Sequence, residues 1–68
     1  MQVKVVLIPE RTDWTLKVKQ GAKIYDLIKK LNLNPDTRIA LRADMPVPID
    51  SEVIDNDEIE LVRVVSGG

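Results

Sequence analysis

The chain has 68 residues, of which 44% are hydrophobic and 31% are charged, and it has neither Cys nor His. A chain of this length folds as one domain around one modest core. The missing side chains exclude disulfides, cysteine zinc sites, thiolate nucleophiles and imidazole bases, and with them most enzyme chemistries. The net charge of −1 argues against nucleic-acid binding. No apolar run approaches the ~18 residues of a membrane span, and the start does not resemble a signal peptide. This composition suits a reduced, cytoplasmic protein.

The first third of the chain predicts a β-hairpin. Residues 1–8 are rich in β-branched side chains and predict a strand whose Val6 and Ile8 face away from the core. A polar turn follows, and residues 14–19 then alternate apolar and polar side chains, as a half-buried strand does.

The period changes after Gly21. Apolar residues in the range 24–31 recur at i, i+3, i+4 and i+7, the stripe of an amphipathic helix. Asp26 in its first turn and two lysines in its last turn match the helix dipole. Asn32 and Asn34 tolerate left-handed geometry and Pro35 blocks continuation, so we expect the helix to end near residue 31.

Three further strands are expected. Residues 37–42 predict a strand with Ile39 and Leu41 facing inward. The prolines in 45–49 allow at most a short edge strand, and 58–65 predict the last strand after a turn at 55–57. The expected core consists of Val3, Val5, Trp14, Leu16, Val18, Ile24, Leu27, Ile28, Leu31, Ile39, Leu41, Ile59 and Leu61.

The order β-β-α-β-(β)-β predicts an α+β fold. One helix with one apolar stripe covers one face of a mixed sheet of four to five strands. Because the helix and third strand leave room for a crossover, the last strand can pair parallel to the first at the sheet centre. That arrangement is the β-grasp, and we expect it to span residues 1–65, followed by a flexible Ser-Gly-Gly tail at 66–68.

Apolar side chains are also expected on the face that the helix leaves open, where polar residues are usual. They indicate either a docking patch for a partner or ordinary β-propensity. The expected patch consists of Val6, Ile8, Ala40, Val62 and Val64, flanked by Arg38 and Arg42.

Two other features have a simple and a functional interpretation. The acidic run 55–60 could bind calcium, but it lacks the glycine and the terminal Glu of an EF-hand and is better explained as a solvated turn. Trp14 and Tyr25 could stack on bases, but without a basic groove core packing is favoured for Trp14. No catalytic or metal-ligating set emerges from the sequence.

The sequence ends with Ser66-Gly67-Gly68. This end is either a frayed terminus or cloning remnant, or a reactive group. Glycines without Cβ atoms can thread a narrow channel and leave an ionised carboxylate unhindered. Another enzyme could then adenylate that carboxylate and make it electrophilic.

Four features combine in this chain: the β-β-α-β-β order, the segment 21–33 (GAKIYDLIKKLNL), the segment 55–62 (DNDEIELV) and the ending VSGG. Together they resemble the ThiS/MoaD sulfur-carrier family, which includes ubiquitin-like small archaeal modifier proteins. The resemblance covers essentially the whole chain. The chain departs from the usual pattern at Asn56, where Gly is typical, and at Lys23, where Thr or Ser is frequent.

The resemblance implies a carrier or modifier rather than an enzyme. Gly68 would be adenylated by an activating enzyme with Mg-ATP, and Gly67 and Ser66 would lead it into that enzyme. The product would be a thiocarboxylate for sulfur delivery (to molybdopterin, thiamine or tRNA) or an isopeptide bond to a target lysine. The free protein would be a monomer without a bound cofactor, and its partners would be the activating enzyme and a sulfur donor, sulfur acceptor or target protein. The alternative is a β-grasp interaction module whose Gly-Gly end is incidental.

Overall fold

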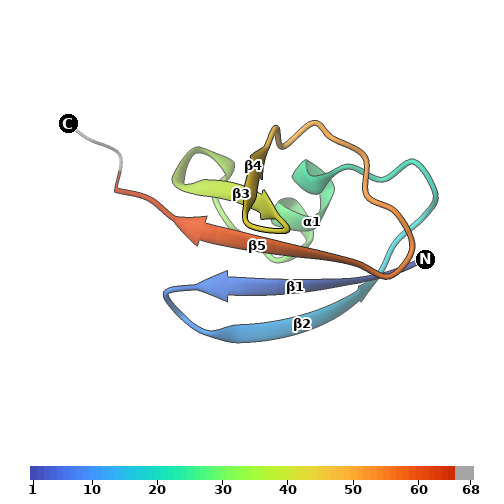
Figure 1. Cartoon of the computed structure of the whole chain (residues 1–68), viewed down its shortest axis with the longest axis horizontal. Coiled ribbons are helices and arrows are strands. Elements are labelled where there is room, and N and C mark those ends of the chain that lie inside the picture. The colour runs from blue at the N-terminus through green and yellow to red at the C-terminus, as the bar shows by residue number, and fades with distance from the viewer. Residues whose placement is uncertain (66–68) are drawn as a thin grey trace.

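The structure is a computed structural model that describes residues 1–65 of the chain. Its five strands form one sheet in the order β2-β1-β5-β3-β4. β1 and β5 pair in parallel at its centre, and the other neighbours are antiparallel (Figure 1). With one helix on this mixed sheet, the predicted α+β β-grasp is confirmed. The elements are β1 (Gln2–Ile8), β2 (Thr12–Lys17), α1 (Ile24–Lys30), the 3-10 helix η1 (Pro35–Thr37), β3 (Arg38–Arg42), β4 (Met45–Val47) and β5 (Asp57–Arg63).

The short helix α1 begins without a Ser, Thr or Asp at its cap. Instead, the Asp26 carboxylate accepts a hydrogen bond from the Lys23 amide at 2.9 Å. The Ile24 amide donates to Ser51 O at 3.0 Å, so the segment before β5 satisfies a helix donor that would otherwise lack a partner. At the other end Asn32 adopts a φ of 59°, as predicted, and closes the helix. None of the helices among residues 1–65 is long and apolar enough to cross a membrane.

The core lies between α1 and the inner face of the sheet. Two residues that were predicted in it are exposed, Trp14 at 47% and Ile39 at 44%, so both predictions are wrong. Trp14 belongs to the edge strand β2, which has a strand on one side only, and a seven-residue helix is too short to cover it. Leu41 is only partly buried and alternates with the buried Ala40, so it faces outward like Ile39 and its predicted place in the core is also wrong. The buried hydrophobic residues are Val3, Val5, Leu7, Ile24, Leu27, Ile28, Ala40, Val53, Ile59 and Leu61.

The orientation of β3 is the main difference from the prediction. Ala40 lies opposite Leu61 of β5 and is 1% exposed, so it faces the core. Ile39 lies opposite Val62 and faces outward. Because side chains alternate along a strand, Arg38 and Arg42 share the inner face with Ala40. The pattern Arg-Ile-Ala-Leu-Arg alternates in either direction, and the larger aliphatic side chains favoured the wrong one.

Candidate functional site

An apolar surface occupies the carboxyl end of the sheet face that α1 leaves open. Val6 and Ile8 contribute to it from β1, Val62 from β5 and Ile39 from β3; we call these four residues the outer-face patch. Ile8 and Ile39 lie opposite Val62 on its two sides. Ile39 is 44% exposed, and the other three are partly exposed. Aliphatic side chains from three adjacent strands thus form one continuous surface.

Three of the predicted patch residues, Val6, Ile8 and Val62, lie on this face. Val64 is partly buried just beyond β5, where strand alternation directs it to the same side. The outward orientation predicted for Ala40 is wrong, and Ile39 takes its place. No local signal on β3 separates the two orientations. The partner-binding roles of all these residues stay predictions.

Arg38 is not a flank of the patch but a buried clamp. Its guanidinium donates to Leu61 O at 3.2 Å and to Glu10 Oε1 at 3.2 Å, and its second nitrogen bonds Glu10 Oε2. A longer bond of 3.4 Å reaches Ile8 O. The Arg38 side chain is only 4% exposed, whereas that of Glu10 is 31% exposed. One side chain therefore ties the end of β1, the β1–β2 turn and the last part of β5 together.

The clamp changes the acidity of Glu10. Hydrogen bonds from Arg38 lower the pKa of the Glu10 carboxyl from 4.5 to about 2, with further help from a backbone hydrogen bond and the charges of Arg38 and Arg63. The folded state therefore favours the ionised carboxylate. Its contribution to stability is fully present above pH 4.5 and is lost as the pH falls toward 2.

We expect Glu10→Gln to lower the thermal midpoint at neutral pH, because glutamine cannot form the charge-assisted bonds to Arg38. The difference from the wild type should shrink between pH 4.5 and about 2, where the wild-type carboxylate also becomes protonated. Melting curves at steps from pH 7 to pH 2 measure this difference. Glu58→Gln, on the exposed outer face, is the control for losing a carboxylate. A difference that stays constant over the whole range would contradict the role of the clamp.

Arg42 likewise lies away from the patch. Its Nη2 donates to Asp57 Oδ2 at 2.7 Å and its Nε to Asp57 Oδ1 at 3.2 Å, and Nη2 also reaches Glu52 O at 3.0 Å. Asp57 in turn accepts from the Ile54 and Glu58 amides. These bonds show that the acidic segment 55–60 begins as a hydrogen-bonded turn. Among residues 1–65, no three metal-ligating side chains gather as a metal site requires.

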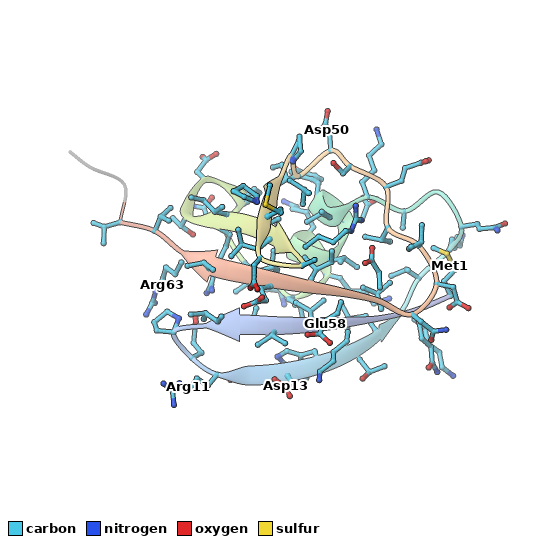
Figure 2. All side chains as sticks on the ribbon, in the orientation of Figure 1. Met1, Arg11, Asp13, Asp50, Glu58 and Arg63 are labelled. Carbon is cyan, nitrogen blue, oxygen red and sulfur yellow. The ribbon has the colours of Figure 1, made fainter. Side chains whose placement is uncertain are left out.

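The chain is held firmly up to the point where the tail begins. Beyond β5, the Val64 amide donates to Thr37 O at 2.8 Å, and the next residue, Val65, is 93% exposed. The end of β5 lies beside the β1–β2 turn (Figure 1). Arg11 and Arg63 are at this end and Met1 at the other (Figure 2). The predicted tail residues Ser66, Gly67 and Gly68 lie outside the described residues.

This sheet order under a single helix, with an apolar open face, defines a ubiquitin-like protein of the β-grasp class. The family model of small archaeal modifier protein 2 matches residues 1–65, and the chain belongs to this family. The resemblance to sulfur carriers and small archaeal modifiers that the sequence suggested is thereby confirmed.

Similar proteins come from bacteria and archaea. The sulfur carrier protein TtuB of Thermus thermophilus is 33% identical over 67 residues, which cover 97% of this chain and all of TtuB. An uncharacterized protein of Archaeoglobus fulgidus is 35% identical over 48 residues, or 71% of this chain and 70% of that protein. The solved structure of Caldiarchaeum subterraneum ubiquitin has a TM-score of 0.76 at 22% identity and covers 100% of this chain and 98% of that one. At that identity the ubiquitin structure supports the fold alone.

Proposed function

We propose that this protein is a carrier or modifier that is activated at Gly68 by a separate enzyme. The Gly68 carboxylate attacks the α-phosphorus of Mg-ATP in that enzyme, pyrophosphate leaves, and an acyl adenylate forms. A sulfide-level sulfur donor then displaces AMP to give a thiocarboxylate, or a lysine amine displaces it to give an isopeptide bond. The domain itself holds no nucleotide and acts as the substrate of the enzyme.

One observation carries this proposal: the outer-face patch lies at the same end of the sheet from which the chain leaves β5. Val62 belongs to the patch, and Val64, two residues later, is still hydrogen-bonded to Thr37. An enzyme that covers the patch would therefore meet the start of the tail at a fixed position. A defined starting point reduces the conformational entropy that is lost when a tail is threaded into a channel.

The strength of such a complex can be bounded from the patch. Complete burial of four aliphatic side chains would supply roughly 6–12 kcal/mol, and three of the four are already partly buried. Association costs about 4–15 kcal/mol. These magnitudes favour a reversible complex, which a carrier that visits several partners requires.

Of the two fates of the acyl adenylate, similarity to a relative favours sulfur delivery, because TtuB, which is named a sulfur carrier, aligns with nearly the whole chain. Intact-mass measurement of the protein from its native cell tests the proposal. The replacement of one oxygen by one sulfur supports delivery, whereas adducts on target lysines support conjugation. If the protein stays unmodified even with its activating enzyme and ATP, the proposal is wrong. The alternative, a β-grasp interaction module without chemistry at its tail, would then be supported.

We expect Val62→Asp to weaken binding to the activating enzyme strongly and to slow adenylation. A carboxylate in the centre of the outer-face patch would be desolvated without a partner when the enzyme covers it. The free energy of unfolding should change by no more than about 1 kcal/mol, the range of strand propensities, because this face lies outside the core. Titration calorimetry with the enzyme and a denaturation curve measure the two effects.

Ile54→Asp is the matched control, because Ile54 is 65% exposed and precedes β5 at the other end of the strand. It introduces the same charge away from the patch and should leave binding unchanged. Equal losses of affinity in both variants would show that net charge, rather than the patch, governs docking.

A further inference from the structure

The edge strand β2 offers a second surface, unrelated to the tail. β2 is outermost in the sheet, and on its far side it pairs with no other strand of residues 1–65. An edge strand presents backbone N–H and C=O groups that another extended chain can pair with. Which groups these are follows from the pairing of β2 with β1.

Met1 and Val18 exchange both backbone hydrogen bonds, with distances of 3.0 and 2.9 Å. In an antiparallel pair such residues alternate with residues whose backbone groups point the other way. From the register, Leu16 and Trp14 therefore bond to β1, and the backbone groups of Asp13, Thr15 and Lys17 point to the open edge. The bond from Lys30 Nζ to Lys17 O, at 3.1 Å, agrees with this direction.

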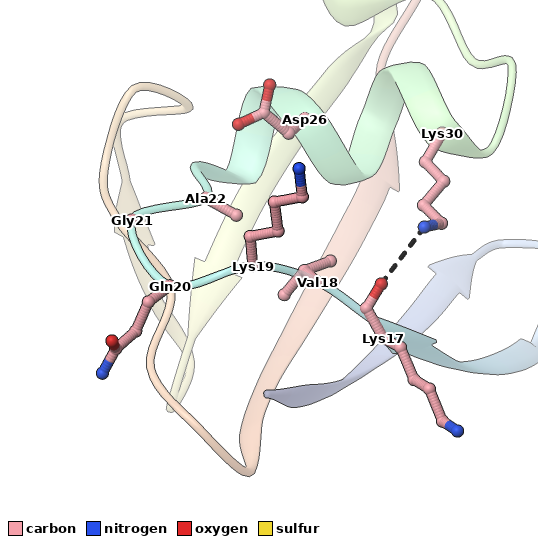
Figure 3. Close-up of a pocket in the computed structure, with 8 residues that line it drawn as sticks. All are labelled: Lys17, Val18, Lys19, Gln20, Gly21, Ala22, Asp26 and Lys30. Atoms are coloured by element: carbon pink, nitrogen blue, oxygen red, sulfur yellow. Dashed lines mark hydrogen bonds between the residues drawn. The ribbon is translucent and has the colours of Figure 1, made fainter.

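A groove continues from this open edge toward the helix. Residues 17–22 form one wall, Asp26 and Lys30 of α1 form the other, and the volume is about 630 Å³ (Figure 3). Val18 and Ala22, both partly buried, contribute its apolar lining. Half-exposed Trp14 lies on the same inner side of β2, farther along the strand from the groove.

The charge of the groove is positive. Three lysines line it, Lys17, Lys19 and Lys30, against the single carboxylate of Asp26, which accepts a hydrogen bond at the helix start. Figure 3 shows the Lys19 side chain reaching between its loop and α1, while the Lys17 side chain points away from the helix. The ammonium groups available inside the groove are therefore those of Lys19 and Lys30.

We propose that β2 and this groove bind an extended, acidic segment of another protein by strand addition. The segment pairs with the open backbone groups of Asp13, Thr15 and Lys17, and its alternate apolar side chains pack beside Trp14, Leu16 and Val18. Its N–H takes over Lys17 O, so Lys30 is released to pair with a carboxylate of the segment. The positive groove thus selects acidic partners.

This surface is independent of the proposed activation site. β2 runs antiparallel to β1 and β1 parallel to β5, so the groove at the end of β2 lies at the opposite end of the sheet from the end of β5 (Figure 1). A partner bound here leaves the outer-face patch and the start of the tail accessible. Binding can therefore be tested without any activation chemistry.

The experiment uses the full chain, labelled with ¹⁵N, and two synthetic peptides. Both peptides contain a segment in which β-branched and polar residues alternate. In one peptide an acidic run precedes this segment, and in the other the acidic run follows it, so that both directions of the added strand are tested. We expect one of them to shift the amide signals of Thr15 and Lys17 and to slow their hydrogen exchange. Val6 and Val62, on the outer face, should not respond. Binding should weaken as salt is added.

Two pairs of variants separate the charge from the backbone pairing. Lys30→Glu should weaken peptide binding about fivefold or more, whereas Lys29→Glu, the adjacent lysine that does not line the groove, should change it less than about twofold. Thr15→Pro removes an open-edge N–H that β1 does not use and should abolish binding. Thr15→Val keeps that N–H and should bind normally.

Three results would overturn the proposal. The first is the absence of any peptide-dependent shift at millimolar concentration. The second is a set of shifts confined to the outer-face patch. The third is a concentration-dependent shift of Thr15 without peptide, which would mean that a second copy of this chain, not an acidic partner, occupies β2. The Lys30→Glu pair keeps the test decisive even if Thr15→Pro fails to fold.

Discussion

Deletion of Gly67 and Gly68 is expected to abolish ATP–pyrophosphate exchange by the activating enzyme. The carboxylate of the shortened chain would no longer reach the α-phosphate, and the new last residue would carry a Cβ into a channel suited to glycine. Docking should persist, because the outer-face patch and the Val64 to Thr37 hydrogen bond are retained. The assay mixes the variant, the enzyme, ATP and labelled pyrophosphate.

An added alanine after Gly68 is the complementary variant. It lengthens the tail instead of shortening it, and it should also prevent exchange while leaving the melting temperature and the affinity for the enzyme close to those of the wild type. Exchange at the wild-type rate by the deletion variant would exclude Gly68 as the activated residue. Loss of affinity in both variants would instead show that the tail contributes much of the docking energy.

Leu27→Ala is expected to lower the free energy of unfolding by about 2–5 kcal/mol. Leu27 is 0% exposed and lies on the apolar stripe of α1. The substitution removes buried methyl groups and leaves a cavity that a close-packed core refills only in part. For a domain with roughly 5–15 kcal/mol of total stability, this is a large share. Urea denaturation measures the change as a lower midpoint at an unchanged slope.

Ile39→Ala is the matched control for Leu27→Ala. It also removes an aliphatic side chain, but from the half-exposed outer face. We expect it to cost clearly less than Leu27→Ala. Equal costs for the two variants would mean that Ile39 is packed like a core residue and that β3 faces the opposite way.

The local periodicity of the sequence was sufficient for most of the elements. The apolar stripe between residues 24 and 31 fits only a helix, and the alternation in β1 and β5 fits only a strand with one face inward. Each assignment is unambiguous because its pattern repeats over several residues. The order of elements, with a helix between the first and last strands, then left the β-grasp as the natural arrangement. The family followed from these elements together with the glycine ending.

The inner face of β3 was decided by tertiary structure. A shift of one residue exchanges the faces of a strand, and Arg-Ile-Ala-Leu-Arg supports either choice. The observed choice buries Arg38 and partly buries Arg42, which is favourable only because Glu10 and Asp57 bring carboxylates to them. Those partners are 28 and 15 residues away, beyond the reach of any local pattern.

Val53 and Trp14 also show that a local sequence pattern does not determine burial: one is buried without such a pattern, and the other is exposed in spite of one. Val53 and Ile54 are adjacent apolar residues in a mostly polar segment, and no periodicity marks either one as a core residue. Val53 is nevertheless buried and its amide donates to Ala22 O, because that segment folds back against the start of α1, whereas Ile54 is 65% exposed. Trp14 has the alternation of a core residue, yet it is exposed because β2 is an edge strand. The sequence by itself thus determined the elements, their order and the family, since these depend on near neighbours in the chain. Tertiary structure alone decided which residues of β3 form the outer-face patch and which residues are buried as ion pairs, because both depend on partners that only folding brings together.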